Sequence, residues 1–171
     1  MTARISRFLL FAAFGLLTIL APLVPHAPGA DRVPPDLLYC VVMIWTLRAP
    51  AAAPLWAVVA LGLLADALLM RPPGLGTLGL VLASEAGRAR TPMPGGFGFL
   101  VEWLAVSGLF AVLTLATQAV LHLTLAPGAD WSAALTLIIL TALSYGPLAV
   151  ALGWLLRLTG PRRPTPRGAL A

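Results

Sequence analysis

Long apolar runs, separated by clusters of proline, glycine and arginine, dominate the pattern of this chain. A helix that crosses the hydrocarbon core of a bilayer needs about 20 mostly apolar residues, or somewhat fewer where the membrane thins. Turn-forming clusters such as RPPG and APGAD lie between the runs, where backbone polar groups can reach the interface. The pattern predicts a bundle of six transmembrane helices, at residues 8–24, 35–48, 54–70, 74–87, 99–126 and 132–158.

Composition supports a membrane protein rather than a soluble one. Hydrophobic residues make up 60% of the chain and charged residues 10%, which leaves too little polar surface to cover a soluble globule of 171 residues. We therefore expect an all-α integral membrane protein, with one six-span domain at residues 1–158 and a short basic tail at 159–171. Both termini are expected to be cytoplasmic.

The N-terminus allows a second interpretation. Arg4 and Arg7 before the apolar run could be the charged and hydrophobic regions of a secretory signal peptide. The small-residue site at Ala27 is followed by Pro28, which disfavours cleavage. We expect the first span to be retained.

The arginines predict the orientation, because positive charge hinders translocation of short loops. Six spans with cytoplasmic termini put nine of the eleven arginines inside and leave Arg32 and Arg71 outside. We expect an inner-membrane location with several passes. The net charge of +5 is thus attributed to topology, and no arginine run interleaved with aromatics indicates a nucleic-acid surface.

Four acidic residues fall within or at the edges of the spans, where an exposed charge is costly. The predicted topology places Asp36 and Asp66 in the periplasmic half and Glu85 and Glu102 towards the cytoplasmic side. This arrangement indicates two interfacial layers of charge rather than a path across the membrane. Structural pairing or helix capping is favoured for these acids, with a partner contact or a transport role as alternatives. Basic partners are available in each layer: Arg32 and Arg71 outside; Arg48, Arg88 and Arg90 inside, with Arg88 on the same helix face as Glu85.

Two local patterns refine this interpretation. Asp36 follows VPP at the start of an apolar run, as a helix N-cap does. Gly79, Ala83 and Gly87 recur every four residues, so the fourth span is expected to pack closely, either inside the bundle or against a partner. The five tryptophans lie near predicted span ends, where an aromatic belt would anchor the bundle.

The sequence offers no catalytic constellation. Ser107 and His122 are the candidate nucleophile and base, but fifteen residues of one helix separate them by about 22 Å. The chain lacks lysine, so it has no lysine-ended phosphate loop, and its single cysteine, Cys40, rules out a Cys-based metal cage. We expect a protein that is not an enzyme and that uses no cofactor or metal.

The segments VPPDLLYCVVMIWTLRAP and LGLLADALLMRPPGLGTLGLVLASE together resemble the MreD family of bacterial rod shape-determining membrane proteins. The shared elements are a Pro-Asp start to a short second span, a Gly-Leu-Leu-x-Asp third span and a Pro-Gly-Leu-Gly start to the fourth. The resemblance covers residues 33–90. The candidate interaction or structural positions, from this motif and from the patterns above, are Pro35, Asp36, Gly62, Asp66, Pro73, Gly74, Gly76, Gly79, Ala83, Glu85 and Glu102.

The resemblance implies a non-catalytic scaffold of the elongasome, the machinery that inserts lateral-wall peptidoglycan. The implied partners are an MreC-type periplasmic scaffold, a RodA-type glycosyltransferase with its class B transpeptidase, and MreB filaments, besides membrane lipid. The family's fold resembles the substrate-binding subunits of energy-coupling-factor transporters. The alternative is therefore a small-solute-binding membrane subunit of a transporter.

Overall fold

The computed structural model describes residues 2–24, 33–89, 98–123 and 131–158. These residues form six α-helices and two short 3-10 helices, and they contain no strand. The tail at 159–171 and several residues with a predicted location, among them Arg32, Arg90 and Arg162, lie outside the described ranges. The helices are α1 (Thr2–Leu20), η1 (Ala21–Leu23), α2 (Leu37–Arg48), η2 (Pro50–Ala52), α3 (Leu55–Leu68), α4 (Leu75–Arg88), α5 (Gly98–Leu123) and α6 (Trp131–Leu158).

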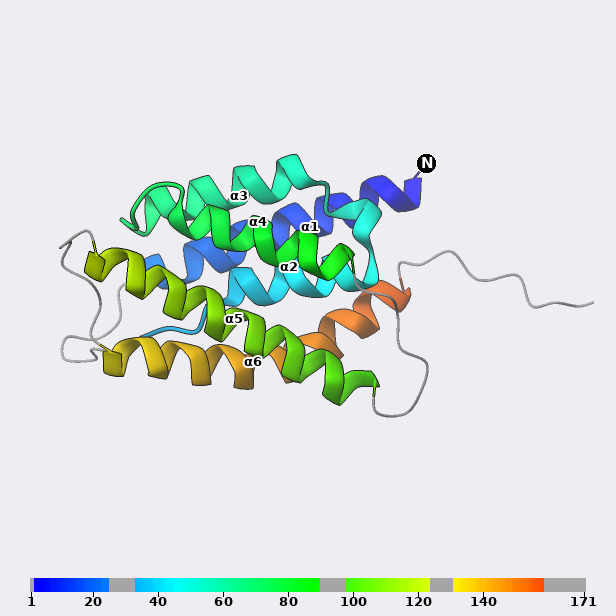
Figure 1. Ribbon diagram of the computed structural model, residues 1–171. Helices are drawn as coiled ribbons and strands as arrows, with labels where there is room; N and C mark the ends of the chain where they lie inside the picture. The colour runs from blue at the N-terminus through cyan, green and yellow to red at the C-terminus, as the bar shows by residue number, and fades with distance from the viewer. Residues whose placement is uncertain (1, 25–32, 90–97, 124–130, 159–171) are drawn as a thin grey trace, which may run out of the picture.

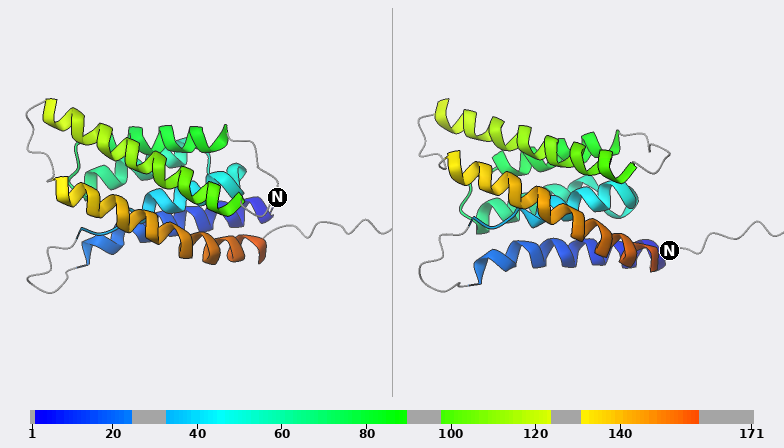
Figure 2. Two further views of the ribbon diagram at one scale, coloured as in Figure 1. Left: turned by 60° about the horizontal axis from the view of Figure 1, so that its bottom comes forward. Right: turned by 90° about the horizontal axis from the view of Figure 1, so that it is seen from below.

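The six helices run roughly along one direction and alternate in sense from one to the next (Figure 1). The start of α1 and the end of α6 therefore lie at the same end of the bundle, as two further views show (Figure 2). We call this the Arg48 end, because α2 finishes there at Arg48. The opposite end, where Asp36 precedes α2, is called the Asp36 end.

Helix lengths divide the bundle into two classes. Three segments are long and apolar enough to cross a membrane: Arg4–Leu23, Gly98–Leu123 and Trp131–Leu156. In contrast, α2 has 12 residues and α3 and α4 have 14 each, which at 1.5 Å per residue gives only about 18–21 Å. The all-α membrane fold expected from the sequence is confirmed. The orientation of its termini stays a prediction.

The short helix α2 forms the core of the bundle. Every residue from Leu38 to Thr46 is buried, and α2 packs against α1, α4 and α6. Tyr39 adds a contact with α5, where its ring lies 4.6 Å from that of Phe110. A helix enclosed on all sides shows no amphipathic pattern, in keeping with the continuous run LLYCVVMIW.

Trp45 is a correction to the expected aromatic belt. Its side chain is fully buried, lies between Phe11 and Phe14 of α1, and donates from Nε1 to the carbonyl of Arg7 at 3.3 Å. Position near a span end does not reveal whether that end faces lipid or another helix. The interfacial interpretation is therefore wrong for Trp45, whereas Trp56, Trp131 and Trp154 are exposed.

The outer faces of the long helices are apolar. Large hydrophobic side chains such as Leu104, Val112, Ile139, Leu143 and Val150 are exposed along α5 and α6. In water such a surface would drive aggregation, but in a bilayer lipid chains cover it at no cost. These faces are consistent with the membrane environment that the composition predicts.

Candidate functional site

Asp36 begins α2 and joins three elements at the Asp36 end. Its Oδ1 accepts from the backbone N–H of Tyr39 at 3.1 Å, so the predicted N-cap is confirmed. Its Oδ2 forms an ion pair with Arg71 at 3.1 Å, and its own N–H donates to the hydroxyl of Thr141 on α6 at 2.9 Å. Pro35 supports the start of α2 by accepting from the N–H of Leu37 at 3.0 Å. The Pro-Asp motif therefore fixes the position of the central helix.

Asp66 serves a second cap. This α3 carboxylate is only 2% exposed, and its Oδ2 accepts from the N–H of Gly74 at 3.0 Å and from both donors of Thr77, at 3.1 Å and 2.8 Å. The acceptor satisfies amides that the first turn of α4 leaves free. A carboxylate also suits the positive end of the helix dipole. Asp66 thus binds the start of α4 to α3, and it does so without an arginine partner in the described contacts.

The glycines of the motif make room for this cap. Gly74 adopts a positive φ of 88°, which glycine accommodates without strain. A Cβ at Gly76 would collide with Oδ1 of Asp66, and a Cβ at Gly62 would lie 3.0 Å from the Thr77 side chain. Pro73 occupies the exposed turn before Gly74. The Gly-x-x-x-Asp and Pro-Gly-Leu-Gly motifs are therefore two halves of one α3–α4 contact.

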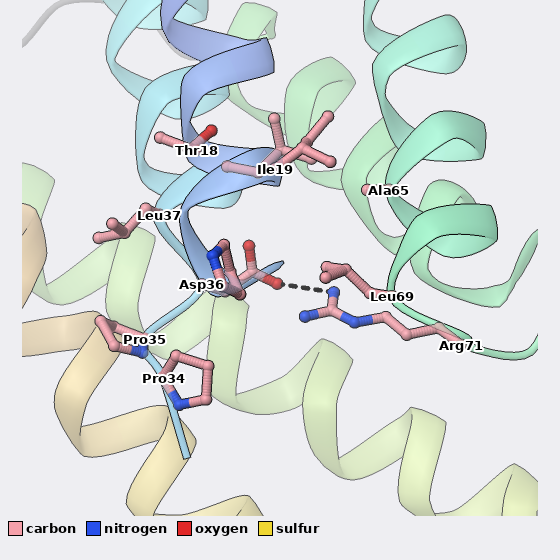
Figure 3. Close-up of a pocket in the computed structure, with 11 residues that line it drawn as sticks. Thr18, Ile19, Pro34, Pro35, Asp36, Leu37, Ala65, Leu69 and Arg71 are labelled. Carbon is pink, nitrogen blue, oxygen red and sulfur yellow. Dashed lines mark hydrogen bonds and ion pairs between the residues drawn. The ribbon is translucent and has the colours of Figure 1, made fainter. Parts of the chain in front are cut away.

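A cavity of about 220 Å³ lies beside the Asp36–Arg71 pair (Figure 3). One wall comes from Thr18, Ile19 and Pro22 at the end of α1 and in η1, a second from residues 34–38, and a third from the end of α3 at Ala65 and Leu69. In Figure 3 the Arg71 side chain extends from the end of α3 towards Asp36. The cavity therefore combines apolar walls with one ion pair.

The second charged layer lies at the Arg48 end and joins α2, α5 and α6. Oε1 of Glu102 pairs with Arg48 at 3.3 Å and accepts from the hydroxyl of the buried Tyr145 at 2.6 Å. Arg48 also donates to the carbonyl of Ala149, and a Cβ at Gly153 would collide with its guanidinium. The expected pairing of Glu102 with a basic residue of its own layer is confirmed.

Glu85 and Arg88 form the expected same-face pair on α4, with Oε1 and Nε 2.9 Å apart. Glu85 is half-exposed, whereas Arg88 also donates to the carbonyls of Pro50 and Ala53. Arg88 thus holds the end of α4 against the α2–α3 connection.

The small-residue face of α4 divides between inside and outside. Ala83 and Gly87 are buried, and a Cβ at Gly87 would lie 3.3 Å from the side chains of Met43 and Thr46 on α2. A Cβ at Gly79 would meet no described atom within 4 Å. The sequence left open whether this face packs internally or against a partner. Two of its three residues pack internally.

Three residues of these clusters had not been singled out as candidates: Thr77, Thr141 and Tyr145. Thr77 is the one that the sequence could have signalled, because it lies three residues after Gly74, at a position whose N–H needs a cap. Thr141 and Tyr145 lie within a uniformly apolar helix, and their partners are 105 and 43 residues away along the chain. No local pattern predicts such contacts.

The described residues offer little for catalysis. They contain no group of three or more His, Cys, Asp or Glu side chains that could hold a metal ion. His122 stacks on Trp131 with ring centroids 5.3 Å apart. The clusters described above connect helices, and the arrangement they define is that of a helical membrane protein stabilised by polar contacts at two levels.

Comparison with known families assigns the chain more closely. Residues 2–84 match the family model of the rod shape-determining protein MreD. The match includes Asp36, Asp66, Arg71 and Thr77, and it makes the region from α1 into α4 similar to the MreD family. No curated protein and no solved structure matches the chain.

The MreD family consists of structural membrane proteins that determine rod shape, and it is associated with the MreC/MreB system. The resemblance noted from residues 33–90 is confirmed. The matched region begins earlier, at the start of α1, and ends within α4.

Proposed function

We propose that this protein is a non-catalytic scaffold of the elongasome, which supports rod shape and lateral peptidoglycan synthesis by binding an MreC-type scaffold and the associated wall synthases. The family match over α1–α4 carries the proposal. The ionisable side chains support it, because Asp66 and Glu102 join helices to each other and the carboxylate of Asp36 pairs with Arg71 in the α3–α4 connection. Each of them stabilises the shape of the bundle, which is what an adaptor must present to its partners.

The proposed orientation places the Arg48 end in the cytoplasm of a bacterium and the Asp36 end towards the periplasm. Arg7, Arg48 and Arg88 lie at the Arg48 end, and this placement follows the positive-inside rule. In this orientation the bundle is a multi-pass protein of the inner membrane. The Asp36 end would meet an MreC-type periplasmic scaffold, and MreB filaments would lie on the side of the Arg48 end and the basic tail.

We further propose that the candidate positions act by positioning helices rather than by touching partners directly. Pro35 and Asp36 place α2, whereas Gly62, Asp66, Pro73, Gly74 and Gly76 place α4. Partner binding then falls to the exposed apolar faces, where helix association in lipid relies on close packing. Gly79, which is partly buried and where an added Cβ would meet no described atom within 4 Å, is a candidate position on such a face.

Depletion of the protein in a rod-shaped host tests the role directly. Cells should become round, and lateral insertion of labelled wall precursors should become dispersed. Re-expression of the intact chain, but not of a chain truncated before α5, should restore rods. Cells that kept their width and insertion pattern after depletion would contradict the proposal.

Affinity purification tests the partners separately. A tagged chain extracted in mild detergent should retain a single-span periplasmic scaffold and a polytopic glycosyltransferase. The comparison variant is Asp66→Ala. It should retain less of both partners if their binding requires the correct position of α4. Absence of both partners, from a preparation that remains monodisperse, would contradict the proposed contacts.

The cavity of about 220 Å³ favours a second candidate, a small-solute-binding subunit of a transporter. Its volume suits a small polar molecule, and the Asp36–Arg71 pair offers both signs of charge. A co-purifying solute or an energising ATPase pair would support transport. A shape defect on depletion without either would support the scaffold.

A further inference from the structure

We infer that the cavity beside Asp36 and Arg71 is a water-filled recess that extends from the Asp36 end into the hydrocarbon depth of the membrane. This inference is independent of the proposed partners. It relies on the depth of Asp36, on the extended backbone that precedes it and on the chemistry of the cavity walls.

The depth follows from the contact with α6. The N–H of Asp36 donates to Thr141, which lies ten residues after Trp131 at the start of α6. At about 1.5 Å per residue, Asp36 is therefore about 15 Å along α6 from that end. The helix of 28 residues is about 42 Å long. A hydrocarbon layer of about 30 Å centred on it would begin about 6 Å from Trp131, which leaves Asp36 about 9 Å inside. Asp36 thus lies deeper than the interfacial position expected from the sequence.

The backbone at this depth is not helical. Residues 33–36 have no regular secondary structure and lead into α2, which is too short to cross the membrane alone. Irregular backbone is tolerated at membrane depth where protein encloses it or where it lines water. Pro34 and Pro35 reduce the number of unsatisfied donors, and they form one wall of the cavity.

The exposure of the ion pair indicates that the cavity holds water. The side chain of Arg71 is 39% exposed and that of Asp36 is 17% exposed, although both lie beside a cavity at this level. A partly exposed guanidinium facing lipid chains would be costly. Water in the cavity can instead accept from those N–H groups of Arg71 that do not bind Asp36. A cavity of about 220 Å³ has room for about seven waters at their liquid volume of about 30 Å³ each.

Thiol accessibility tests the recess. Leu37→Cys and Leu69→Cys place a thiol on two walls of the cavity. Ile139→Cys and Leu143→Cys flank the level of Thr141 but lie on the exposed apolar face of α6. The native Cys40 is buried, so the unaltered protein provides the background rate. Each variant is purified and placed in lipid nanodiscs, where a charged maleimide reaches both membrane surfaces and the result does not depend on orientation.

We expect Leu37→Cys and Leu69→Cys to react at least about tenfold faster than the two α6 variants, because only a hydrated thiol ionises readily to the reactive thiolate. Ala169→Cys verifies that the reagent is active, and gel filtration verifies that each variant folds. If one wall variant fails to fold, Thr18→Cys replaces it. Rates at the wall positions as low as those at Ile139→Cys and Leu143→Cys would overturn the inference, since the cavity would then be dry.

Discussion

Thr77 donates two hydrogen bonds to the same oxygen of Asp66, one from its backbone N–H and one from its hydroxyl. Both residues are buried, and they join α3 to the first turn of α4 across a tight turn at Pro72–Gly74. Because lipid offers no replacement donor or acceptor, the loss of this contact would leave polar groups unsatisfied. The Asp66–Thr77 contact is therefore expected to determine the packing of the α3–α4 hairpin.

Asp66→Ala should lower the free energy of unfolding by about 2–4 kcal/mol, because three donors lose their acceptor at once. Asp66→Asn should lose less, since an amide oxygen can still accept. The measurement is an SDS titration of protein purified in mild detergent. Leu64→Ala, on the exposed face of α3, is the control and should change stability by under about 0.5 kcal/mol. Equal losses for Asp66→Ala and this control would refute the cap.

Two glycines of α4 provide a matched pair of alanine substitutions. Gly76→Ala should destabilise the protein by about 1–3 kcal/mol, because the new methyl group displaces the Asp66 carboxylate. Gly79→Ala has open space around it and should be neutral or stabilise by up to about 1 kcal/mol through helix propensity. Thermal unfolding midpoints of the two variants, measured side by side, check the sign of the difference. A stabilising Gly76→Ala would contradict the close approach.

At the Arg48 end, loss of the Glu102 carboxylate should lower the free energy of unfolding more than loss of the Tyr145 hydroxyl. Tyr145→Phe removes one hydrogen bond and should lower stability by about 1 kcal/mol. Glu102→Ala removes the acceptor of the Tyr145 hydroxyl and the carboxylate partner of Arg48, and should lower stability by about 2–3 kcal/mol. Glu85→Ala, which breaks a half-exposed pair, is the control and should lower stability by less than about 0.5 kcal/mol. The same SDS titration ranks the three variants, and the reverse order would contradict the arrangement.

A double-mutant cycle should detect the Asp36–Arg71 pair. We expect Asp36→Asn and Arg71→Met to show a coupling free energy of about 1 kcal/mol, intermediate between surface and buried pairs. The amide of asparagine retains the capping of Tyr39, so the cycle isolates the charge interaction. A parallel cycle pairs Asp36→Asn with Arg48→Met, which lies at the opposite end of the bundle. The effects of these two substitutions should be additive within about 0.5 kcal/mol. Coupling of zero in the first cycle would mean that the pair does not form in the membrane.

Much of the local structure could be predicted from the sequence. The proline and glycine clusters between the helices mark their boundaries to within a few residues: the predicted ranges 35–48 and 74–87 compare with Leu37–Arg48 and Leu75–Arg88, whereas α1 begins six residues before the predicted 8. The cap at Asp36 and the Glu85–Arg88 pair were also predictable, because each depends on residues within one helical turn. The sequence could narrow the choice of basic partner for Glu102 only to a layer of three arginines, and it did not show that Asp66 caps a different helix from its own.

The sequence alone determined which segments are helical, which residues cap or pair within a turn, and that the chain is a membrane protein. The tertiary structure decided that α2 is the enclosed helix, that Trp45 is buried against the rings of Phe11 and Phe14, and that Asp36 lies beside a cavity. The reason is physical. In water a buried face differs from an exposed one in hydrophobicity, but lipid chains are as apolar as a protein core, so the hydrophobic pattern of a transmembrane helix does not record which face packs inward. Shape complementarity and a few distant polar contacts make that choice, and both depend on the assembled bundle.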